Sequence, residues 1–423
     1  MLQTLKNAWK IPELRRKIFY TVMLIIVFRL GTFIPVPYLS QETMQQLLDT
    51  SGANSLLDFL NTFSGGAFAQ ATIFAMSVTP YINASIIMQL MTVVIPALER
   101  IQKEGEQGRQ RMNQYTRYLA TTLGFLQATG LYFLVSNEAS RGVLSFFVMT
   151  MTFTAGTAFL MWLGEQISEK GIGSGISVII FAGIVSRAPA MIDGLSKYME
   201  ADGSWFVLAA IVIGALLIVA AVVLMNDSER RLQVQYAKRV VGRKMYGGQS
   251  SHIPIKLLAA GVMPIIFAMS ILTFPSTIAQ FFNVNESSAG WVGTLLKYIS
   301  PSGWIYGVLC FLLIVFFTFF YTTIQFNPVE IANGMKRNGG FFPGIRAGKP
   351  TSDYIARVLS RLTIAGATFL GLMAVLPIFL SMMGTLNINI GGTSILIVVG
   401  VAMETTRQLE SLMLMRSYKG FME

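Results

Sequence analysis

Long apolar runs recur along the whole chain, and short polar or basic stretches separate them. Most of the runs have the length of about 17–25 residues that an α-helix needs to cross the hydrocarbon core of a bilayer. Their length and composition predict an all-α membrane protein. Ten transmembrane helices are predicted, at about 18–36, 73–96, 118–136, 146–165, 176–192, 206–226, 258–281, 304–324, 362–383 and 393–411.

Composition supports a chain that crosses the membrane many times. Hydrophobic residues make up 53% of the 423 positions, charged residues make up 13%, and the mean hydropathy is +0.58. A soluble domain on a single anchor would not carry apolar runs from end to end. The only cysteine, Cys310, lies in an apolar run, and the only histidine is His252. We therefore expect no intrachain disulfide, no metal site, no cofactor and no histidine-dependent catalysis.

The basic residues are distributed unevenly between the two predicted sides. With ten spans both termini share a side, and the loops of that side hold most of the lysines and arginines. The opposite loops hold only Arg141, Lys197 and Lys297. Because cytosolic loops are enriched in Lys and Arg, both termini are predicted to be cytosolic. The same distribution explains the net charge of +11 without binding of nucleic acid.

Five spans in each half give the two halves opposite orientations. We expect an N-terminal half at 1–195 and a C-terminal half at 196–423, related as inverted halves, although no residue-level repeat is visible. Such an arrangement favours a cavity near the middle of the membrane, between the halves.

One stretch near the N-terminus has features that a simple lipid-facing helix does not need. The short amphipathic segment Leu56–Phe63 is followed by Ser64-Gly65-Gly66, a hinge-like pair of glycines. In the apolar run Ile73–Ile95, Pro80 removes a backbone donor and Asn83 places an amide among aliphatic side chains. The pattern predicts a short segment that is joined by a hinge to a broken helix facing an internal cavity.

Two cytosolic loops are longer than ordinary connections. Residues 227–257 alternate apolar and charged positions and predict a short hairpin that ends at Gly247-Gly248. Residues 325–361 are rich in turn signals, among them Phe326-Asn327-Pro328. Basic loops commonly set orientation and contact lipid headgroups. The length and turn chemistry of these two favour a docking surface for a cytosolic partner.

A series of motifs in order along the chain resembles the SecY family, the pore-forming subunits of protein translocases. The motifs are Phe28-Arg29-Leu30-Gly31 with Ile34-Pro35-Val36-Pro37, Phe63-Ser64-Gly65-Gly66-Ala67, Thr79-Pro80-Tyr81-Ile82-Asn83-Ala84, Gly105-Glu106-Gln107-Gly108-Arg109, Trp162-Leu163-Gly164-Glu165-Gln166, Gly171-Ile172-Gly173-Ser174-Gly175, Gln235-Tyr236-Ala237-Lys238-Arg239, Pro343-Gly344-Ile345-Arg346 and Gly391-Gly392-Thr393-Ser394.

The resemblance implies an hourglass pore with a narrow waist, a plug and a lateral gate. It assigns the waist to a ring of aliphatic residues, Val78, Ile82, Ile176, Ile180, Ile266 and Ile397. Val78 and Ile82, like Ile176 and Ile180, are four positions apart and share a helix face. On sequence alone, these residues could equally be packing or lipid-facing side chains.

The resemblance also assigns the plug, the gate and the docking residues. The plug is residues 56–68, with Leu56, Leu57, Phe59, Leu60, Phe63, Gly65 and Gly66; an ordinary interfacial or re-entrant helix is the alternative. The gate lies between the second and seventh spans, with Asn83, Gln127, Ser270, Thr273 and Phe274. Its polar groups could instead bond their own backbone. The resemblance assigns docking of a cytosolic partner to Arg239, Arg243 and Arg346, which could also be solvated or face lipid.

The implied function is passage of unfolded preproteins across the bacterial plasma membrane, with lateral release of apolar segments into lipid. The implied partners are SecE-like and SecG-like small subunits, a SecA-like ATPase, the ribosome, signal sequences and preprotein chains, and membrane lipid. The resemblance implies no enzymatic activity, and no P-loop is present in the sequence to supply energy.

Two other functions are compatible with parts of the sequence. A secondary transporter for a neutral solute is compatible with inverted halves, but the middle third of the spans is almost free of charge. An intramembrane protease would need a base beside Ser174 in Gly173-Ser174-Gly175, and His252 lies in a cytosolic loop. Solute counterflow in liposomes distinguishes a carrier from a polypeptide channel.

Overall fold

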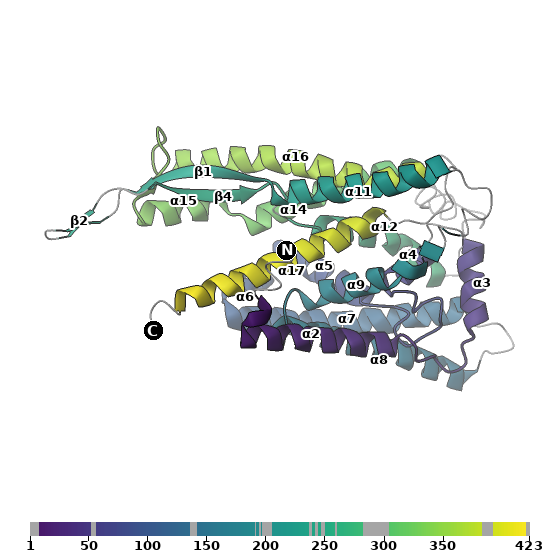
Figure 1. Ribbon diagram of the computed structural model, residues 1–423. Helices are drawn as coiled ribbons and strands as arrows, with labels where there is room; N and C mark the ends of the chain where they lie inside the picture. Colours follow the sequence, from purple (N-terminus) through teal and green to yellow (C-terminus); the bar gives the residue numbers. More distant parts are fainter. Residues whose placement is uncertain are drawn as a thin grey trace.

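The computed structural model describes residues 8–51, 56–135, 142–190, 192–193, 196, 205–236, 239–241, 244–246, 250–258, 260–281, 304–382 and 392–419. Most of the described residues form helices that run lengthwise beside one another in a bundle (Figure 1). Each predicted transmembrane run overlaps one of these helices. They are α2 (Pro12–Gly31), α5 (Thr79–Val94), α7 (Glu106–Val135), α8 (Val143–Lys170), α9 (Gly175–Ser186), α11 (Trp205–Asp227), α12 (Met263–Phe281), α14 (Trp304–Gln325), α16 (Lys349–Met382) and α17 (Gly392–Lys419).

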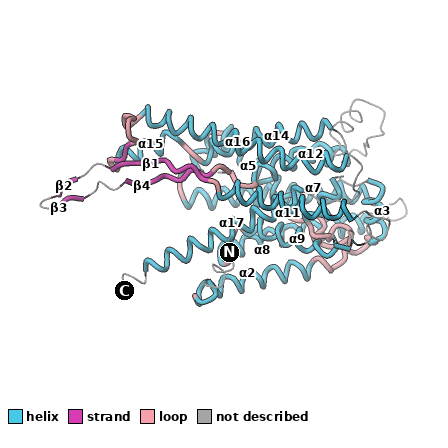
Figure 2. The backbone as a smooth tube through the Cα atoms, turned by 45° about the horizontal axis from the view of Figure 1, so that its top comes forward, coloured by secondary structure: helices cyan, strands magenta, loops and turns pink. Residues whose placement is uncertain are grey.

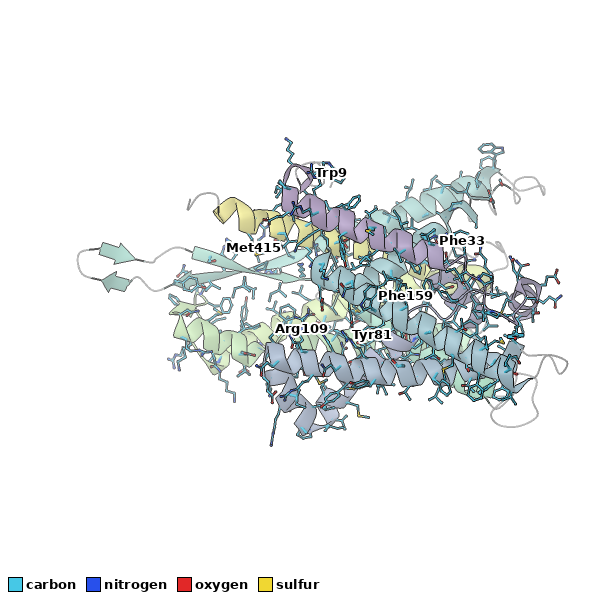
Figure 3. All side chains as sticks on the ribbon, turned by 90° about the horizontal axis from the view of Figure 1, so that it is seen from below. Trp9, Phe33, Tyr81, Arg109, Phe159 and Met415 are labelled. Carbon is cyan, nitrogen blue, oxygen red and sulfur yellow. The ribbon has the colours of Figure 1, made fainter. Side chains whose placement is uncertain are left out.

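Long apolar stretches make this a membrane protein by length and composition. Within the described residues, four helical stretches satisfy both criteria, and the bent pair α5 and α6 (Pro96–Lys103) forms a fifth. The four are Glu106–Val135, Val143–Lys170, Trp304–Arg337 and Lys349–Leu376. Exposed apolar side chains cover the outer faces of the bundle; Phe33 is 64% exposed and Phe159 is 40% exposed (Figure 3).

Several helices continue beyond their apolar runs. α7 begins twelve residues before its predicted span, at Glu106, and α17 continues past its predicted end to Lys419. Backbone hydrogen bonds sustain a helix in water as well as in lipid, so the end of an apolar run is not the end of the helix. The predicted helices were therefore too short at the polar ends of α7 and α17.

The second predicted span begins later than expected. Residues 64–78 form buried turns, and α5 starts only at Thr79. Pro80 stands in the first turn of α5, where a missing N–H costs nothing, so it begins the helix and does not break it. The break lies at Ile95, whose extended backbone precedes Pro96 and turns α6 by 103° away from α5. The prediction of a broken helix was right, but its position was wrong.

The fifth predicted span is also shorter than expected. α9 has 12 residues and ends at Ser186. Arg187 follows as its C-cap residue, and its charge marks the end of the apolar run. α9 packs against α8 and α17, and its interior residues are almost all buried. Interhelical contacts therefore cover this short helix.

The two long loops form one folded unit at one end of the bundle (Figures 1 and 2). β1 (Glu229–Tyr236) pairs antiparallel with β4 (Ser250–Lys256) and also with β5 (Gly340–Phe341) of the other loop. β2 (Arg239–Val241) pairs with β3 (Lys244–Tyr246) at the tip of the hairpin. The hairpin prediction is confirmed up to β3, which ends at Tyr246, and Gly247-Gly248 lie outside the described residues.

Helices replace much of the predicted turn-rich loop at 325–361. Asn327 caps α15 (Pro328–Arg337) by accepting hydrogen bonds from the N–H groups of Val329, at 3.1 Å, and Glu330, at 3.4 Å. The signal Phe326-Asn327-Pro328 is therefore a helix start and not an isolated turn. A small apolar core joins the sheet to α15 and α16 through Leu232, Val234, Ile255, Met335, Phe342, Ile355 and Leu359.

The two ends of the bundle differ in content. The strands, α6, α15 and the C-terminal part of α17 lie at one end, on the left in Figure 1, and α3 (Gln41–Ser51) and α4 (Leu56–Phe63) lie toward the other. Figure 3 places Arg109 toward the strand-bearing end and Phe33 toward the opposite one. The two long loops, α6 and the end of α17 therefore lie at the same end of the bundle.

Candidate functional site

The predicted waist residues lie in the interior of the bundle. Val78 stands at the N-cap position of α5, Ile82 is on α5, Ile176 and Ile180 are on α9, Ile266 is on α12 and Ile397 is on α17. Five belong to one buried cluster and are at most 7% exposed. Ile176 is partly buried at its edge, against Gly164 of α8. Segments from four separate parts of the sequence thus meet in one apolar region.

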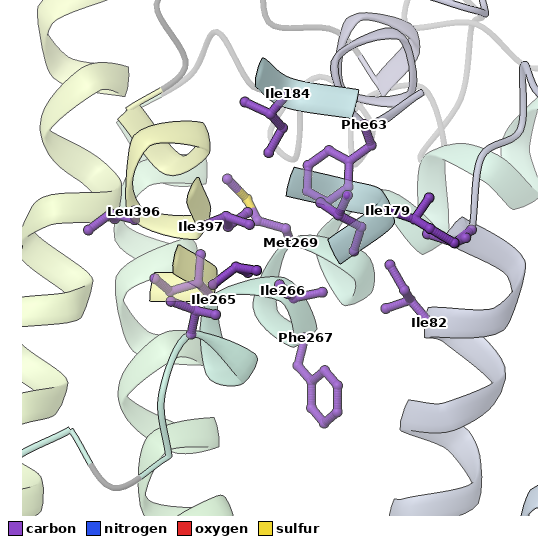
Figure 4. Packing of buried hydrophobic residues seen from close by; sticks show 14 of the residues in the cluster. Phe63, Ile82, Ile179, Ile184, Ile265, Ile266, Phe267, Met269, Leu396 and Ile397 are labelled. Atoms are coloured by element: carbon purple, nitrogen blue, oxygen red, sulfur yellow. The ribbon is translucent and has the colours of Figure 1, made fainter. Parts of the chain in front are cut away.

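Figure 4 shows three of these side chains in close-up, Ile82, Ile266 and Ile397, which approach from three helices. Met269 of α12 lies between Ile397 and Ile179 of α9. Val78, Ile180, Ile266 and Ile397 are at most 4% exposed. Among the described residues, side chains therefore fill the space around these four and exclude water from them.

Other members of this cluster, which were not among the predicted waist residues, lie beside them. Ile179 is fully buried, Met269 is 7% exposed, and Phe63 is 2% exposed beside them (Figure 4). Met269 follows Ile266 by three positions and Ile179 precedes Ile180 directly. Helical spacing could have suggested Met269, because positions i and i+3 share a face.

The predicted plug begins with α4 and continues as tight turns. Leu57 and Phe63 are buried and Leu60 is partly buried, whereas the side chains of Leu56 and Phe59 lie outside the described residues. Polar side chains fold the turns back onto the helix. The Asn61 Oδ1 atom accepts from the N–H of Ala69 at 3.1 Å, and the Ser77 hydroxyl donates to the carbonyl of Phe63 at 3.1 Å.

Gly65 and Gly66 both have the positive φ that favours glycine, 69° and 89°. The two differ in their surroundings. A Cβ at Gly66 would meet nothing within 4 Å, but one at Gly65 would lie 2.9 Å from the carbonyl oxygen of Gly183 on α9. Gly65 is therefore a close-packing position as well as a turn, which the hinge hypothesis did not foresee.

The predicted gate residues lie on three helices that contact one another, α5, α7 and α12. Asn83 of α5 is 7% exposed, Ser270 of α12 is 3% exposed, and Gln127 of α7 is half-buried. The side chains of Thr273 and Phe274 lie outside the described residues. The fold thus brings the second and seventh predicted spans together, as the gate hypothesis requires.

One polar contact beside the interface of α5 and α12 was not predicted from the sequence. The hydroxyl of Tyr321 on α14 donates to Gln89 Oε1 on α5 at 2.5 Å, and its ring packs edge-on against Phe267 of α12. Gln89 and Tyr321 belong to different predicted halves. Gln89 was detectable, because an amide in an apolar helix needs a partner, but nothing in the sequence identified Tyr321 as that partner.

The predicted docking arginines are placed unequally. Arg346 is exposed in the connection between β5 and α16, and its carbonyl accepts from the Thr351 hydroxyl at 2.8 Å. Arg239 lies on β2, with its side chain outside the described residues, and Arg243 lies outside them altogether. Because β1 pairs with β5, the hairpin and the Arg346 connection belong to one unit.

In Gly173-Ser174-Gly175, Gly173 has a positive φ of 88°, and close packing accounts for Gly175. A Cβ at Gly175 would lie 1.7 Å from the carbonyl oxygen of Gly164 on α8, and its N–H donates to the Ser168 hydroxyl at 2.9 Å. His252 is on β4, opposite Gln233 of β1. Among the described residues, no three His, Cys, Asp or Glu side chains gather as metal ligands would.

The family model for SecY matches residues 72–406, which include α5, the waist helices and both long loops. The chain belongs to the SecY family. It is 44% identical to the protein translocase subunit SecY of Streptomyces coelicolor over 439 aligned residues, covering all of both chains. Identity to the subunit of the same name from Halalkalibacterium halodurans is also 44%, over 438 aligned residues and all of both chains.

Solved structures share the fold of this SecY family member. A protein-conducting channel aligns with a TM-score of 0.67 and 19% identity, over 94% of this chain and 92% of that one. A SecY protein described for a plug that stabilises the closed state aligns with a TM-score of 0.64, 19% identity and the same coverage. Sec61 in the canine ribosome-channel complex aligns with a TM-score of 0.63 and 18% identity, over 94% and 92%. The fold is therefore that of SecY and Sec61 channels.

Proposed function

We propose that this protein is a protein-conducting channel that passes unfolded preproteins across a membrane and releases apolar segments sideways into lipid. The observation that carries the proposal is the convergence of aliphatic side chains from α5, α9, α12 and α17 in one closed interior, with Phe63 of the plug segment beside them. The curated relatives, which match over their full lengths, are translocase subunits.

The chemistry of this interior suits a passage for many different chains. Branched aliphatic side chains offer no specific hydrogen bond, so they can close around varied side chains without retaining any one of them. An apolar constriction also opposes ion flow by dewetting. Packing of the ring residues accordingly supports a seal at rest.

The gate follows from the contacts of α5, α7 and α12. Their buried polar groups fit interhelical hydrogen bonds, which in membranes contribute about 0.6–2 kcal/mol each. Bonds of this strength can be exchanged when a signal sequence replaces helix contacts with its own apolar surface. In the proposed mechanism, the segment enters between α5 and α12, the plug leaves the waist, and the following polar chain passes through.

The finer organisation belongs to the same proposal. Ten membrane crossings would divide into halves at 1–195 and 196–423, with both termini cytosolic in a bacterial plasma membrane. The folded unit of β1–β5 and α15 would face the cytosol and carry Arg239, Arg243 and Arg346. It would dock a SecA-like ATPase or a ribosome, since the chain itself is proposed to supply no catalysis. SecE-like and SecG-like subunits would complete the complex.

Reconstitution tests the proposed function directly. Proteoliposomes that contain this chain, its SecE-like and SecG-like subunits and the SecA-like ATPase should protect a preprotein from external protease in the presence of ATP. A cysteine pair at Asn83 and Phe274, when crosslinked, should stop that protection. Undiminished transport with the pair locked would overturn the gate. Counterflow of a neutral solute without preprotein transport would support the carrier alternative.

A further inference from the structure

Two arginines lie at the ends of apolar helices next to the plug segment. Arg29 is the third residue from the end of α2, and Arg187 directly follows α9. Both are half-buried. A charged side chain within or beside a membrane span is costly unless it has polar partners, so the contacts of these two guanidinium groups indicate what they are for.

Arg29 reaches from α2 to the turn after α4. Its Nη1 donates to the Ser186 hydroxyl at 3.0 Å and lies 3.4 Å from the carbonyl oxygen of Gly65. The Ser186 hydroxyl in turn donates to the carbonyl of Gly183 at 2.6 Å. The guanidinium carbon lies 5.7 Å from the ring centroid of Phe33, which fixes the side chain over that ring. Arg29 thus ties α2 to both α9 and the plug segment.

Arg187 approaches the same turn from α9. Its Nη1 donates to the Thr62 hydroxyl at 2.7 Å, in the last turn of α4. A cation at the C-terminal end of a helix is also favoured by the helix dipole. Arg187 therefore holds Thr62 at the end of α4. Arg29, from a different helix, contacts Gly65 in the turn that follows α4.

The backbones beneath these contacts fit closely. A Cβ at Gly183 would lie 2.6 Å from the carbonyl oxygen of Phe63, and one at Gly65 would lie 2.6 Å from Ser186 Oγ. Along α9, the positions 176, 180, 183 and 187 fall on one helical stripe. That stripe carries waist residues at one end, the glycine under the plug in the middle and Arg187 at the other end.

We propose that Arg29, Ser186 and Arg187 form a latch that holds the plug segment in its closed position. The three are positioning residues: they act through Thr62 and Gly65, and the proposal rests on the proposed channel function. Moving the plug requires breaking these charge-assisted hydrogen bonds. The latch therefore sets how readily the closed channel opens.

The first test measures the plug segment itself and does not depend on transport. In the full-length chain within its complex, Leu60→Cys provides a thiol on α4, while the native Cys310 is buried. The labelling rate of Cys at position 60 by a polar maleimide should rise about tenfold in Arg29→Gln or Arg187→Gln, since a charge-assisted bond is lost in each. Thr62→Val should give the same result as Arg187→Gln, and it retains the charge.

The control is Arg117→Gln, which removes an arginine that pairs with Glu165 between α7 and α8 and touches nothing in the plug. It should leave labelling unchanged. In sealed proteoliposomes without preprotein, Arg29→Gln and Arg187→Gln should also raise ion leak over wild type. The labelling rate and ion leak of the double variant Arg29→Gln/Ser186→Ala should be close to those of each single variant, since both substitutions remove the same hydrogen bond.

The latch would be overturned by wild-type labelling rates in Arg29→Gln, Arg187→Gln and Thr62→Val, together with wild-type ion leak in the two arginine variants. This holds even if the wild type transports preproteins. Failure of the wild type to transport preproteins would overturn the proposed function instead, and the labelling rates would still decide the latch. If Arg29→Gln is not produced as a folded protein, Arg187→Gln and Thr62→Val decide.

Discussion

Tyr321 on α14 and Gln89 on α5 share a hydrogen bond of 2.5 Å that joins the two predicted halves of the molecule. Tyr321 also packs on Phe267 of α12, so a single side chain touches both helices that border the proposed gate. The bond joins α14 to the part of α5 that lies away from the plug segment. Its removal is therefore a direct test of the proposed gate.

Removing this bond should make the gate easier to open. Tyr321→Phe deletes the hydroxyl and keeps the ring, so the change isolates a bond of about 0.6–2 kcal/mol. We expect faster transport of preproteins with weak signal sequences, by a few-fold, and little change for strong ones. Initial rates of ATP-driven protease protection measure this. Gln89→Leu should match it, and the double variant should add little.

Equal rates in both single variants and the wild type would mean that the bond does not restrain the gate. Tyr115→Phe is the matched control, because Tyr115 is exposed on α7 and 43% of its surface is accessible.

Shortening a waist side chain should weaken the resting seal. Ile180 is 1% exposed within the ring, and Ile180→Ala leaves a cavity there. Ion leak through proteoliposomes without preprotein should rise several-fold. Ile213→Ala is the control, since Ile213 is 56% exposed on α11 and its truncation changes no buried packing. A leak that rises equally in both variants would contradict the assignment.

The contact of α8 with α9 should tolerate no side chain at Gly175. A Cβ there would lie 1.7 Å from the Gly164 carbonyl oxygen, so Gly175→Ala must separate the two helices. We expect a loss of about 1–3 kcal/mol in stability, typical of overpacking, seen as a lower midpoint of thermal unfolding in detergent. Gly214→Ala on α11 meets nothing within 4 Å and should be neutral or stabilising.

The two long loops should be covalently linkable at one point. Gln235 of β1 and Phe341 of β5 are directly opposite in the antiparallel pair, and both side chains are exposed. Their Cβ atoms are expected to be about 4.5–5.5 Å apart, so a cysteine pair should form a disulfide on mild oxidation. Cleavage between the two positions, followed by non-reducing electrophoresis, detects the link. A pair at Gln233 and Phe341, out of register, is the control.

The sequence predicted the helices well because apolar length is a strong signal in a membrane protein. It failed where local chemistry has two uses. Pro80 and Pro328 both begin helices, yet each was interpreted as a break or a turn. Helix ends such as Glu106 were missed because hydropathy reports the lipid boundary and not the hydrogen-bonding pattern.

For the site, spacing alone could only pair Val78 with Ile82 and Ile176 with Ile180. The resemblance to a family was needed to bring Ile266 and Ile397 to the same place, since they lie on helices distant in sequence. The pairing of β1 with β5 and the contacts of Arg29 and Arg187 could not be predicted. Each depends on two segments meeting in three dimensions, and neither partner has a distinctive pattern of its own.

α16 is a single helix of 34 residues that begins beside the exposed Arg346 connection and extends through the bundle against α14. At 1.5 Å per residue it is about 50 Å long. A rigid rod of that length transmits a tilt imposed at its end beside Arg346 to its far end, and it would carry α14, with Tyr321, along. Under the proposed function, a partner docked at that end would therefore act on the Tyr321–Gln89 bond from a distance, without contact with the proposed gate.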